Sequence, residues 1–406
     1  MFHRRLLLSS LLFACLVQCP PATAQTSSCL THSNSLYCLP NQNGLFGSPT
    51  GVTPFAPIFS AVGSQLSLLP TASPASGITL RFDPAAGVPV RATESLGPIL
   101  SERAETIGKG KLFLGYTFQR IGFDSIDGAD LKNLPLVFNV CVDAACSATN
   151  PPTVAATNDR LDLKVNQFTS IATYGLTSRI DISVSVPFDT VRLGISRKST
   201  VILQGSPTVF PAPAFGERDA SGIGDVVARA KGTIFSGERF GLAGGVDIRF
   251  PTGDELNFLG SGAYGVKPFV AASYRARVSL HANFGYQWNG DSILASPTGA
   301  ANNSKRQLPT DVFYSVGFEV PTKRVTFTAD FLSFHVFDAL RLSPTTRFGH
   351  PNLAVTTGSL TTSDGSIGFK INPAAGLIIT TNVDIKLDHN GLRHRLIPLV
   401  GIAYTF

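Results

Sequence analysis

The sequence lacks long apolar runs and is poor in charge. Beyond the first 24 residues, no uninterrupted apolar stretch approaches the ~20 residues that a membrane-spanning helix requires. Charged residues make up 15% of the 406-residue chain, against about 25% in an average soluble domain. The basic residues behind the formal net charge of +6 are scattered, which argues against a nucleic-acid surface. What is abundant is Phe, with 29 copies, and an apolar β protein is the class that remains.

The first residues have the layout of a secretory signal. Arg4 and Arg5 precede an apolar run at residues 6–17, and small residues at 22–24 allow cleavage after Ala24. A lipid-modified cysteine within the signal is the weaker alternative, because bulky or polar residues flank both candidates. We expect an exported protein: either a large secreted β protein or a barrel in a bacterial outer membrane.

Cysteine is scarce, and two of the six copies lie in the signal. The other four form close pairs, Cys29 with Cys38 and Cys141 with Cys146, which in an exported protein predict two local disulfides. Neither pair has the second pair of ligands that a zinc site needs. The sequence therefore predicts no metal site and no cofactor.

Residues 25–108 are rich in Pro, Ser, Thr and Gly and show no sustained periodicity. We expect an irregular periplasmic extension or plug there, between the signal at 1–24 and a second domain at 109–406.

From Lys111 onward the pattern has a period of two. In residues 278–288, VSLHANFGYQW, every second side chain is apolar and the others are mostly polar or small, as in a strand with one face in lipid and one in water. About twelve such segments follow one another, and only the second departs from alternation, near Gln167, where we expect a bulge. Their centres are Leu114, Leu163, Ile182, Ala228, Val246, Val270, Ala282, Val316, Phe327, Phe369, Val383 and Val400.

Short and long connections alternate along the chain. The short ones are residues 175–178, 236–239, 275–277, 321–324 and 372–376, which are lengths typical of tight hairpin turns. Outer-membrane barrels have short periplasmic turns and long external loops. The sequence thus predicts an all-β protein: a transmembrane antiparallel β-barrel of about twelve strands.

The chain ends on Phe406, at the close of an alternating segment. The ending resembles the C-terminal recognition strand of outer-membrane proteins, which implies the barrel-assembly machinery and outer-membrane lipid as partners. Pro398 has no amide hydrogen, so we expect one unpaired or bulged position in this strand.

The polar face of the alternating segments carries charges of both signs. We assign it to the lumen, where the side chains either contact solute or hold the barrel's shape, and the sequence favours neither role. The predicted lumen-lining residues are Asp181, Arg229, Lys231, Asp247, Arg249, His281, Asn283, Gln287, Asp311, Glu319, Asp330, Lys370, Asp384 and Lys386. The same parity places Asp162 and Lys164 inside as well.

Two apparent catalytic motifs do not fit their chemistry. Gly260, Gly262 and Gly265 have dinucleotide-loop spacing, but no helix pattern follows them. His281 and Asn283 lack a marked serine nucleophile. We therefore expect no enzyme.

One stretch resembles a known family. Residues 221–235, SGIGDVVARAKGTIF, and the loop and turn after the next strand are similar to the outer-membrane family associated with the meta-pathway of phenol degradation. The matching residues are Gly222, Gly224, Asp225, Lys231, Pro251, Thr252, Gly253, Asp254, Gly260 and Gly262. The resemblance implies a barrel that takes up hydrophobic or aromatic compounds.

Two functions remain open. The first is a channel for passive uptake of small solutes, hydrophobic or aromatic ones by the resemblance, with specificity set by the loop at 251–264 and the lumen residues. The second is a closed structural or surface-binding barrel whose long external loops contact a partner.

Overall fold

The computed structural model describes residues 34–41, 55–66, 80–83, 88–91, 96–140, 153–205, 215–296, 304–322, 324–374 and 376–406. The signal, Cys29, Cys141 and Cys146 lie outside these ranges. Cys38 is disulfide-bonded, and its pairing with Cys29 stays a prediction. No helix in the described part is long and apolar enough to cross a membrane.

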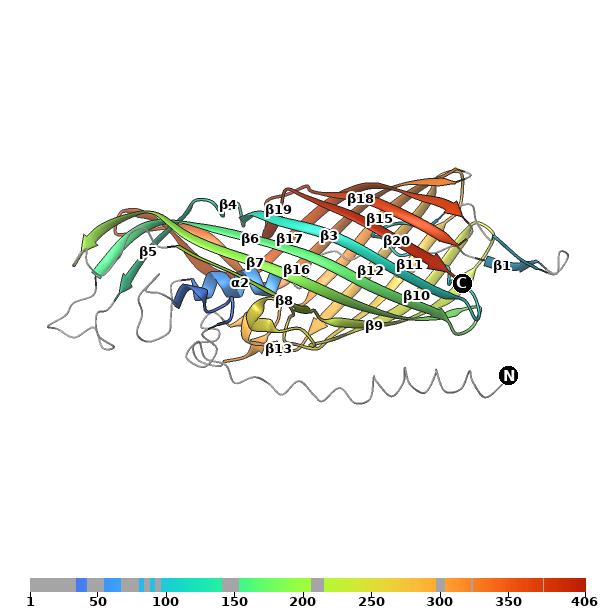
Figure 1. Ribbon diagram of the computed structural model, residues 1–406, viewed down its shortest axis with the longest axis horizontal. Coiled ribbons are helices and arrows are strands. Elements are labelled where there is room, and N and C mark those ends of the chain that lie inside the picture. The colour runs from blue at the N-terminus through green and yellow to red at the C-terminus, as the bar shows by residue number, and fades with distance from the viewer. Residues whose placement is uncertain are drawn as a thin grey trace.

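The protein is a closed, twelve-stranded antiparallel β-barrel, so the predicted fold class is confirmed (Figure 1). Each strand pairs with the next, and β20 closes the barrel against β3. Every predicted strand centre falls in a different barrel strand. The barrel strands are β3 (Leu112–Ile126), β6 (Thr153–Gly175), β7 (Ile180–Gln204), β9 (Val226–Ser236), β10 (Phe240–Phe250), β11 (Gly265–Tyr274), β12 (Ser279–Asn289), β15 (Asp311–Pro321), β16 (Val325–Arg347), β17 (His350–Ala374), β18 (Leu377–Lys386) and β20 (Leu396–Thr405).

Short elements complete the fold. They are η1 (Leu39–Asn41), α2 (Ala56–Leu66), β1 (Leu80–Asp83), β2 (Val88–Arg91), β4 (Ala129–Asp130), β5 (Leu134–Val140), β8 (Phe215–Ile223), η3 (Glu255–Asn257), β13 (Asp291–Ser292), η4 (Ile293–Ala295), β14 (Arg306–Gln307) and β19 (Leu392–His394). The helix α2 was not predicted, because its eleven residues carry no charge and lie in a stretch without a clear period.

All five predicted tight turns connect neighbouring strands at one end of the barrel, which we call the short-turn end. They close with turn hydrogen bonds such as Thr177 N to Ile180 O (3.2 Å) and Gly237 N to Phe240 O (2.8 Å). At the opposite, long-loop end, the β6–β7 and β16–β17 pairs project well beyond the other strands (Figure 1).

The outward face is apolar around most of the barrel. On β12, for example, Leu280, Ala282, Phe284, Tyr286 and Trp288 are exposed while the residues that alternate with them are buried or partly buried. An apolar band of alternate residues is the surface that lipid covers in transmembrane barrels.

Strand β6 departs from this pattern and corrects two predictions. Leu161, Leu163 and Val165 face inward and are buried, whereas Asp162 and Lys164 point outward and pair with each other (3.0 Å). The register of β6 with β3 is continuous through Gln167, so the predicted bulge is absent there. The parity is reversed because the inside of the barrel is apolar at this level, as described below.

The last strand ends as predicted for a closing strand. Phe406 is 59% exposed, and its amide donates to Leu112 O (2.8 Å). Pro398 keeps a register partner on β18, but the pairing of β20 with β3 begins only at Leu399. The missing amide hydrogen therefore falls where the ladder to β3 is interrupted.

Candidate functional site: the barrel interior

Residues 96–107, which we call the crossing segment, run through the barrel near the short-turn end. Their backbone is outside any strand, so its amides need other acceptors. Wall side chains provide them on several strands. The donors and acceptors are Leu96 N to Thr326 Oγ1 (3.2 Å), Leu100 N and Ser101 N to Asp330 (3.4 and 3.3 Å), Glu102 N to Asn283 Oδ1 (2.7 Å), Ala104 N to Ser273 Oγ (2.9 Å) and Ile107 N to Asp181 Oδ2 (2.9 Å).

Apolar contacts join the crossing segment to the rest of the wall. Ile99 and Leu100 pack with Leu332 of β16 and Leu399 of β20. Leu96 packs with Ile378 of β18, and Ile107 with Phe113 of β3 and Ile171 of β6. Strands on all sides of the barrel are reached, which is possible only from within the lumen.

Glu102 is the centre of the largest buried ion cluster of the crossing segment. Its carboxylate accepts from Arg229 Nη1 (2.6 Å) and Lys231 Nζ (2.8 Å), both on β9. Arg229 also binds Asp247 through Nε (2.5 Å) and Nη2 (2.8 Å), and Lys267 pairs with Asp247 as well (3.2 Å). Buried charges are tolerated because each has a partner within hydrogen-bond distance.

Two further cations bind the ends of the crossing segment. Arg275 Nη1 pairs with Glu105 Oε1 (2.5 Å). Lys370 Nζ donates to Pro98 O (2.6 Å) and lies 3.4 Å from Leu96 O. Cations of the wall thus bind both a carboxylate and backbone carbonyl groups of this segment.

The interior of the long-loop half is apolar and contains α2. Buried residues of β3, β6, β7 and β16 pack around α2 in one continuous core that includes Phe59. The Phe59 ring meets the Phe258 ring edge to face, with centroids 5.8 Å apart. Two polar side chains of α2 are also hydrogen-bonded to the surrounding chain. Ser60 Oγ donates to Ser296 O (2.7 Å) and Gln65 Nε2 to Leu340 O (3.1 Å).

The motif behind the family resemblance folds the loop at 251–264 back onto the wall. Asp225 accepts from Gly253 N (3.2 Å) and from Ser261 N (2.8 Å) and its hydroxyl. Thr252 Oγ1 donates to Gly224 O (2.6 Å), and Asp254 caps η3 by accepting from Leu256 N (3.0 Å). The loop carries Phe258, so the motif positions a surface against which α2 packs.

Two glycines of this motif leave no space for a side chain. A Cβ on Gly253 would come within 2.5 Å of Leu259 O, and one on Gly260 within 2.7 Å of the Gly253 Cα. Their role is therefore close backbone packing, which accounts for one glycine, Gly260, of the dinucleotide-like spacing.

None of the residues predicted to line the lumen is exposed. Arg229, Arg249, Gln287 and Lys386 are partly buried, and the others are buried. The structure brings Asp181, Arg229, Lys231, Asn283, Asp330 and Lys370 onto the crossing segment. Arg249 lies 3.6 Å from Asp225, Lys386 binds Asp124 (2.7 Å), and Gln287 donates to Asn289 (2.9 Å).

Sequence reasoning missed the partners that come from the crossing segment. Glu102 and Glu105 lie in SERAETIGKG, the densest charged stretch of the N-terminal region, directly before the first barrel strand. This density of charge could have indicated that the stretch provides ion-pair partners for the barrel wall. Lys267 and Arg275 were missed for another reason, since both lie near the ends of β11.

His281 lies between two other polar side chains, hydrogen-bonded to Ser273 and at ion-pair distance from Glu319. Its Nδ1 is 2.9 Å from Ser273 Oγ, and its Nε2 is 3.2 Å from Glu319 Oε1. This order resembles a catalytic triad, yet all three side chains are buried and the Ala104 amide occupies the Ser273 hydroxyl. A substrate cannot reach the hydroxyl while the crossing segment is in place.

No curated protein matches this chain. Similar solved structures include the COG4313 outer membrane channel from Pseudomonas putida F1 (13% identity, 75% of this chain and 98% of that chain, TM-score 0.44). Others are the CymD monoaromatic hydrocarbon channel (8%, 73% and 88%, TM-score 0.34) and a Pseudomonas aeruginosa FadL homologue (10%, 83% and 97%, TM-score 0.33). With identities of 8 to 13% and TM-scores below 0.5, these structures carry no argument about the function of this chain.

The family comparison is more direct, because it covers the motif itself. The family described as "Putative MetA-pathway of phenol degradation" matches residues 152–335. This range includes the Gly-x-Gly-Asp strand, the Pro-Thr-Gly-Asp loop and the Gly-Ser-Gly turn. The resemblance predicted from these residues is therefore confirmed, and from β6 into β16, up to residue 335, the chain matches that family.

Proposed function

We propose that the protein is an outer-membrane channel for passive uptake of small solutes, and that its N-terminal extension acts as a plug. The supporting observation is how the lumen is filled. Eight strands enclose a space that side chains can fill, and wider barrels leave a channel unless something occupies it. Here the crossing segment and α2 occupy it, and ion pairs and hydrogen bonds hold the crossing segment to the wall.

The solute class follows from the interior and from the family. The long-loop half is lined by buried apolar side chains, and the short-turn half by paired charges and hydroxyls. A small apolar or aromatic compound would suit the first half once α2 leaves it, and would pass the second when the crossing segment moves aside. In this proposal the short turns are periplasmic, Phe406 closes the strand that the assembly machinery recognises, and the chain has no enzymatic role.

The decisive experiment fixes the plug in place. A Cβ on Gly241 would lie 3.2 Å from the Ala104 Cβ, so a shift of a few tenths of an ångström reaches the roughly 3.5–4.5 Å found in disulfides. In the double variant Ala104→Cys and Gly241→Cys, oxidation should tether the crossing segment to β10. Uptake of a fluorescent or radiolabelled aromatic solute into proteoliposomes should stop on oxidation and return after reduction.

The two single-cysteine variants are the matched controls, and neither should respond to oxidation. A further variant lacks residues 25–108 and should show a raised conductance in planar bilayers. The proposal fails if neither the wild-type protein nor the deletion variant passes solute. Flux that persists in the oxidised double variant would show that the plug does not need to move.

A closed surface-binding barrel is the second candidate, and one observation favours it. Strands β6, β7, β16 and β17 are 23 to 25 residues long, about twice the length needed to cross a membrane. Phe215 and Phe348 are exposed on this projecting part. Shortening the β16–β17 hairpin should abolish partner binding and leave solute flux unchanged if this alternative holds.

A further inference from the structure

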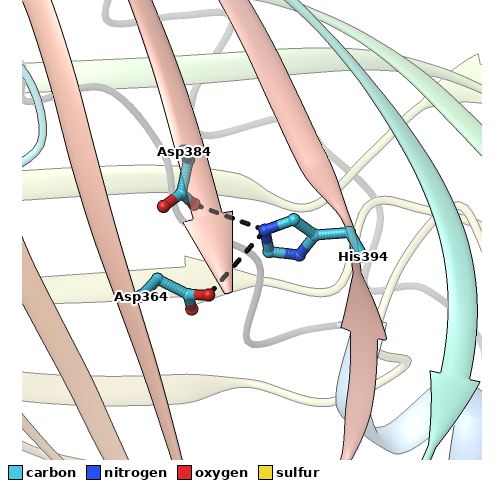
Figure 2. A group of neighbouring side chains, drawn as sticks. All are labelled: Asp364, Asp384 and His394. Carbon is cyan, nitrogen blue, oxygen red and sulfur yellow. Dashed lines mark ion pairs between the residues drawn. The ribbon is translucent and has the colours of Figure 1, made fainter. Parts of the chain in front are cut away.

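Three side chains from three strands converge at the long-loop end of the barrel. Asp364 belongs to β17, Asp384 to β18 and His394 to β19 (Figure 2). His394 Nε2 lies 3.7 Å from Asp364 Oδ1 and 3.8 Å from Asp384 Oδ2. One ligand atom from each residue lies within 4.8 Å of the other two.

All three side chains are buried, and two of them have unsatisfied polar atoms. Asp384 and His394 are each 2% exposed. Among the described residues, the two carboxylate oxygens of Asp384 and the Nε2 atom of His394 have no hydrogen-bond partner. Both are aimed into the space between them (Figure 2). Buried polar atoms in native proteins are normally paired, so these atoms indicate a missing partner.

The local charge also points to a cation. Three carboxylates, Asp364, Asp384 and Asp388, face one guanidinium, that of Arg393, which binds Asp364 and lies 3.5 Å from Asp388. Lys386 is paired with Asp124 (2.7 Å), so the two charges of that pair cancel each other. With all three carboxylates ionised, three negative charges and one positive charge leave two negative charges around the buried Asp364 and Asp384, which is costly without a counter-ion.

We propose that Asp364, Asp384 and His394 bind one divalent metal ion, with Zn²⁺ the best match. Imidazole with carboxylate oxygens is a ligand set that Zn²⁺ accepts, at bond lengths of about 2.0–2.2 Å. Such bonds place ligand atoms of a tetrahedral site roughly 3.4 Å apart. The two distances from His394, 3.7 and 3.8 Å, exceed this by a few tenths of an ångström. The carboxylate oxygens of Asp364 and Asp384 lie within 4.8 Å of each other, and water would supply the remaining ligand.

The position suggests what the metal would stabilise. Strand β19 pairs with β3 and continues the seam between β20 and β3, where β20 itself is not paired with β3. The Leu392 amide donates to Gln65 of α2. A metal that joins β17, β18 and β19 would hold the wall closed at the seam that contacts the plug. Sequence reasoning did not predict it, since its ligands come from separate strands.

Direct measurement on the full-length, untagged protein in detergent tests this proposal. The protein is stripped with EDTA, incubated with Zn²⁺, desalted and analysed by plasma mass spectrometry. We expect one Zn²⁺ per chain, a raised unfolding temperature on loading, and absorption bands of a four- or five-coordinate ion when Co²⁺ replaces Zn²⁺.

The variants Asp384→Asn and His394→Gln should each weaken Zn²⁺ binding at least about tenfold, since even outer-shell changes reach that size. His335→Gln is the matched control, because His335 hydrogen-bonds Thr361 (2.8 Å) and lies outside the cluster. If the wild-type protein holds no stoichiometric Zn²⁺, the proposal is overturned, whatever the variants do. The counter-charge would then be a proton shared between His394 and the carboxylates. Equal Zn²⁺ binding by the wild type and both variants overturns it too, by placing the metal elsewhere.

Discussion

Replacing Glu102 with Gln should release the crossing segment and raise the open fraction of the channel. The Glu102 side chain is 8% exposed and that of Lys231 2% exposed, so their ion pair is shielded from water. Gln keeps one acceptor oxygen but removes the charge. Lys231 would retain the carbonyl oxygens of Arg103 (3.1 Å) and Glu105 (2.9 Å), and it would lose its ion-pair partner among the described residues.

The size of the effect follows from these contacts. Removing one partner of a buried ion pair costs about 3–5 kcal/mol. Arg229 keeps its two bonds to Asp247, and Lys231 keeps two acceptors, so we expect docking of the crossing segment to weaken by about 2–4 kcal/mol. Because about 1.4 kcal/mol is a factor of ten, the undocked population should rise about 30- to 700-fold.

Single-channel recording in planar bilayers measures this change as the fraction of time spent open. Glu217→Gln is the control, because Glu217 forms an exposed pair with Arg192, and exposed pairs contribute at most about 1 kcal/mol. An unchanged open fraction in Glu102→Gln, in a preparation where the deletion of 25–108 conducts, would refute the reasoning.

Three further predictions concern the loop, the pH response and assembly. Gly262→Ala and Gly349→Ala both place a side chain at a positive φ (68° and 75°), at a cost of roughly 1–2 kcal/mol. Only the side chain at position 262 also collides with the Glu255 carboxylate. Gly262→Ala alone should therefore expose residues 251–264 to protease, and equal cleavage of the two variants would contradict this. Burial tends to raise the pKa of Glu105, but two nearby arginines hold it below the usual 4.5. The Glu105–Arg275 ion pair therefore stabilises docking of the crossing segment above pH 4.5 and is lost as the pH falls through the lowered pKa. Conductance should rise in acid, and Glu105→Gln should abolish this rise. Deleting Phe406 should reduce the amount of heat-modifiable barrel in outer-membrane fractions.

The strand number was predictable because it depends on a local property. A β-strand places successive side chains on opposite faces, and lipid requires one of these faces to be apolar. Leu280, Phe284 and Trp288 follow that rule, and they are exposed on β12. The rule fails where the inside is apolar too. Leu163 points inward because α2 fills the long-loop half, and nothing in the local sequence of β6 reports the presence of a helix from residues 56–66.

The interior sites depend on contacts between distant parts of the chain. Glu102 reaches Lys231 across 129 positions, and His394 meets Asp364 from another strand. The register of neighbouring strands and the path of the N-terminal extension create these contacts, and neither has a periodic signal. By itself, the sequence determined the barrel, its twelve strands and its two ends, because alternation and turn length act over a few residues. Only the tertiary structure decided what fills the lumen and which charges meet, because ring closure places residues from distant segments around one enclosed space.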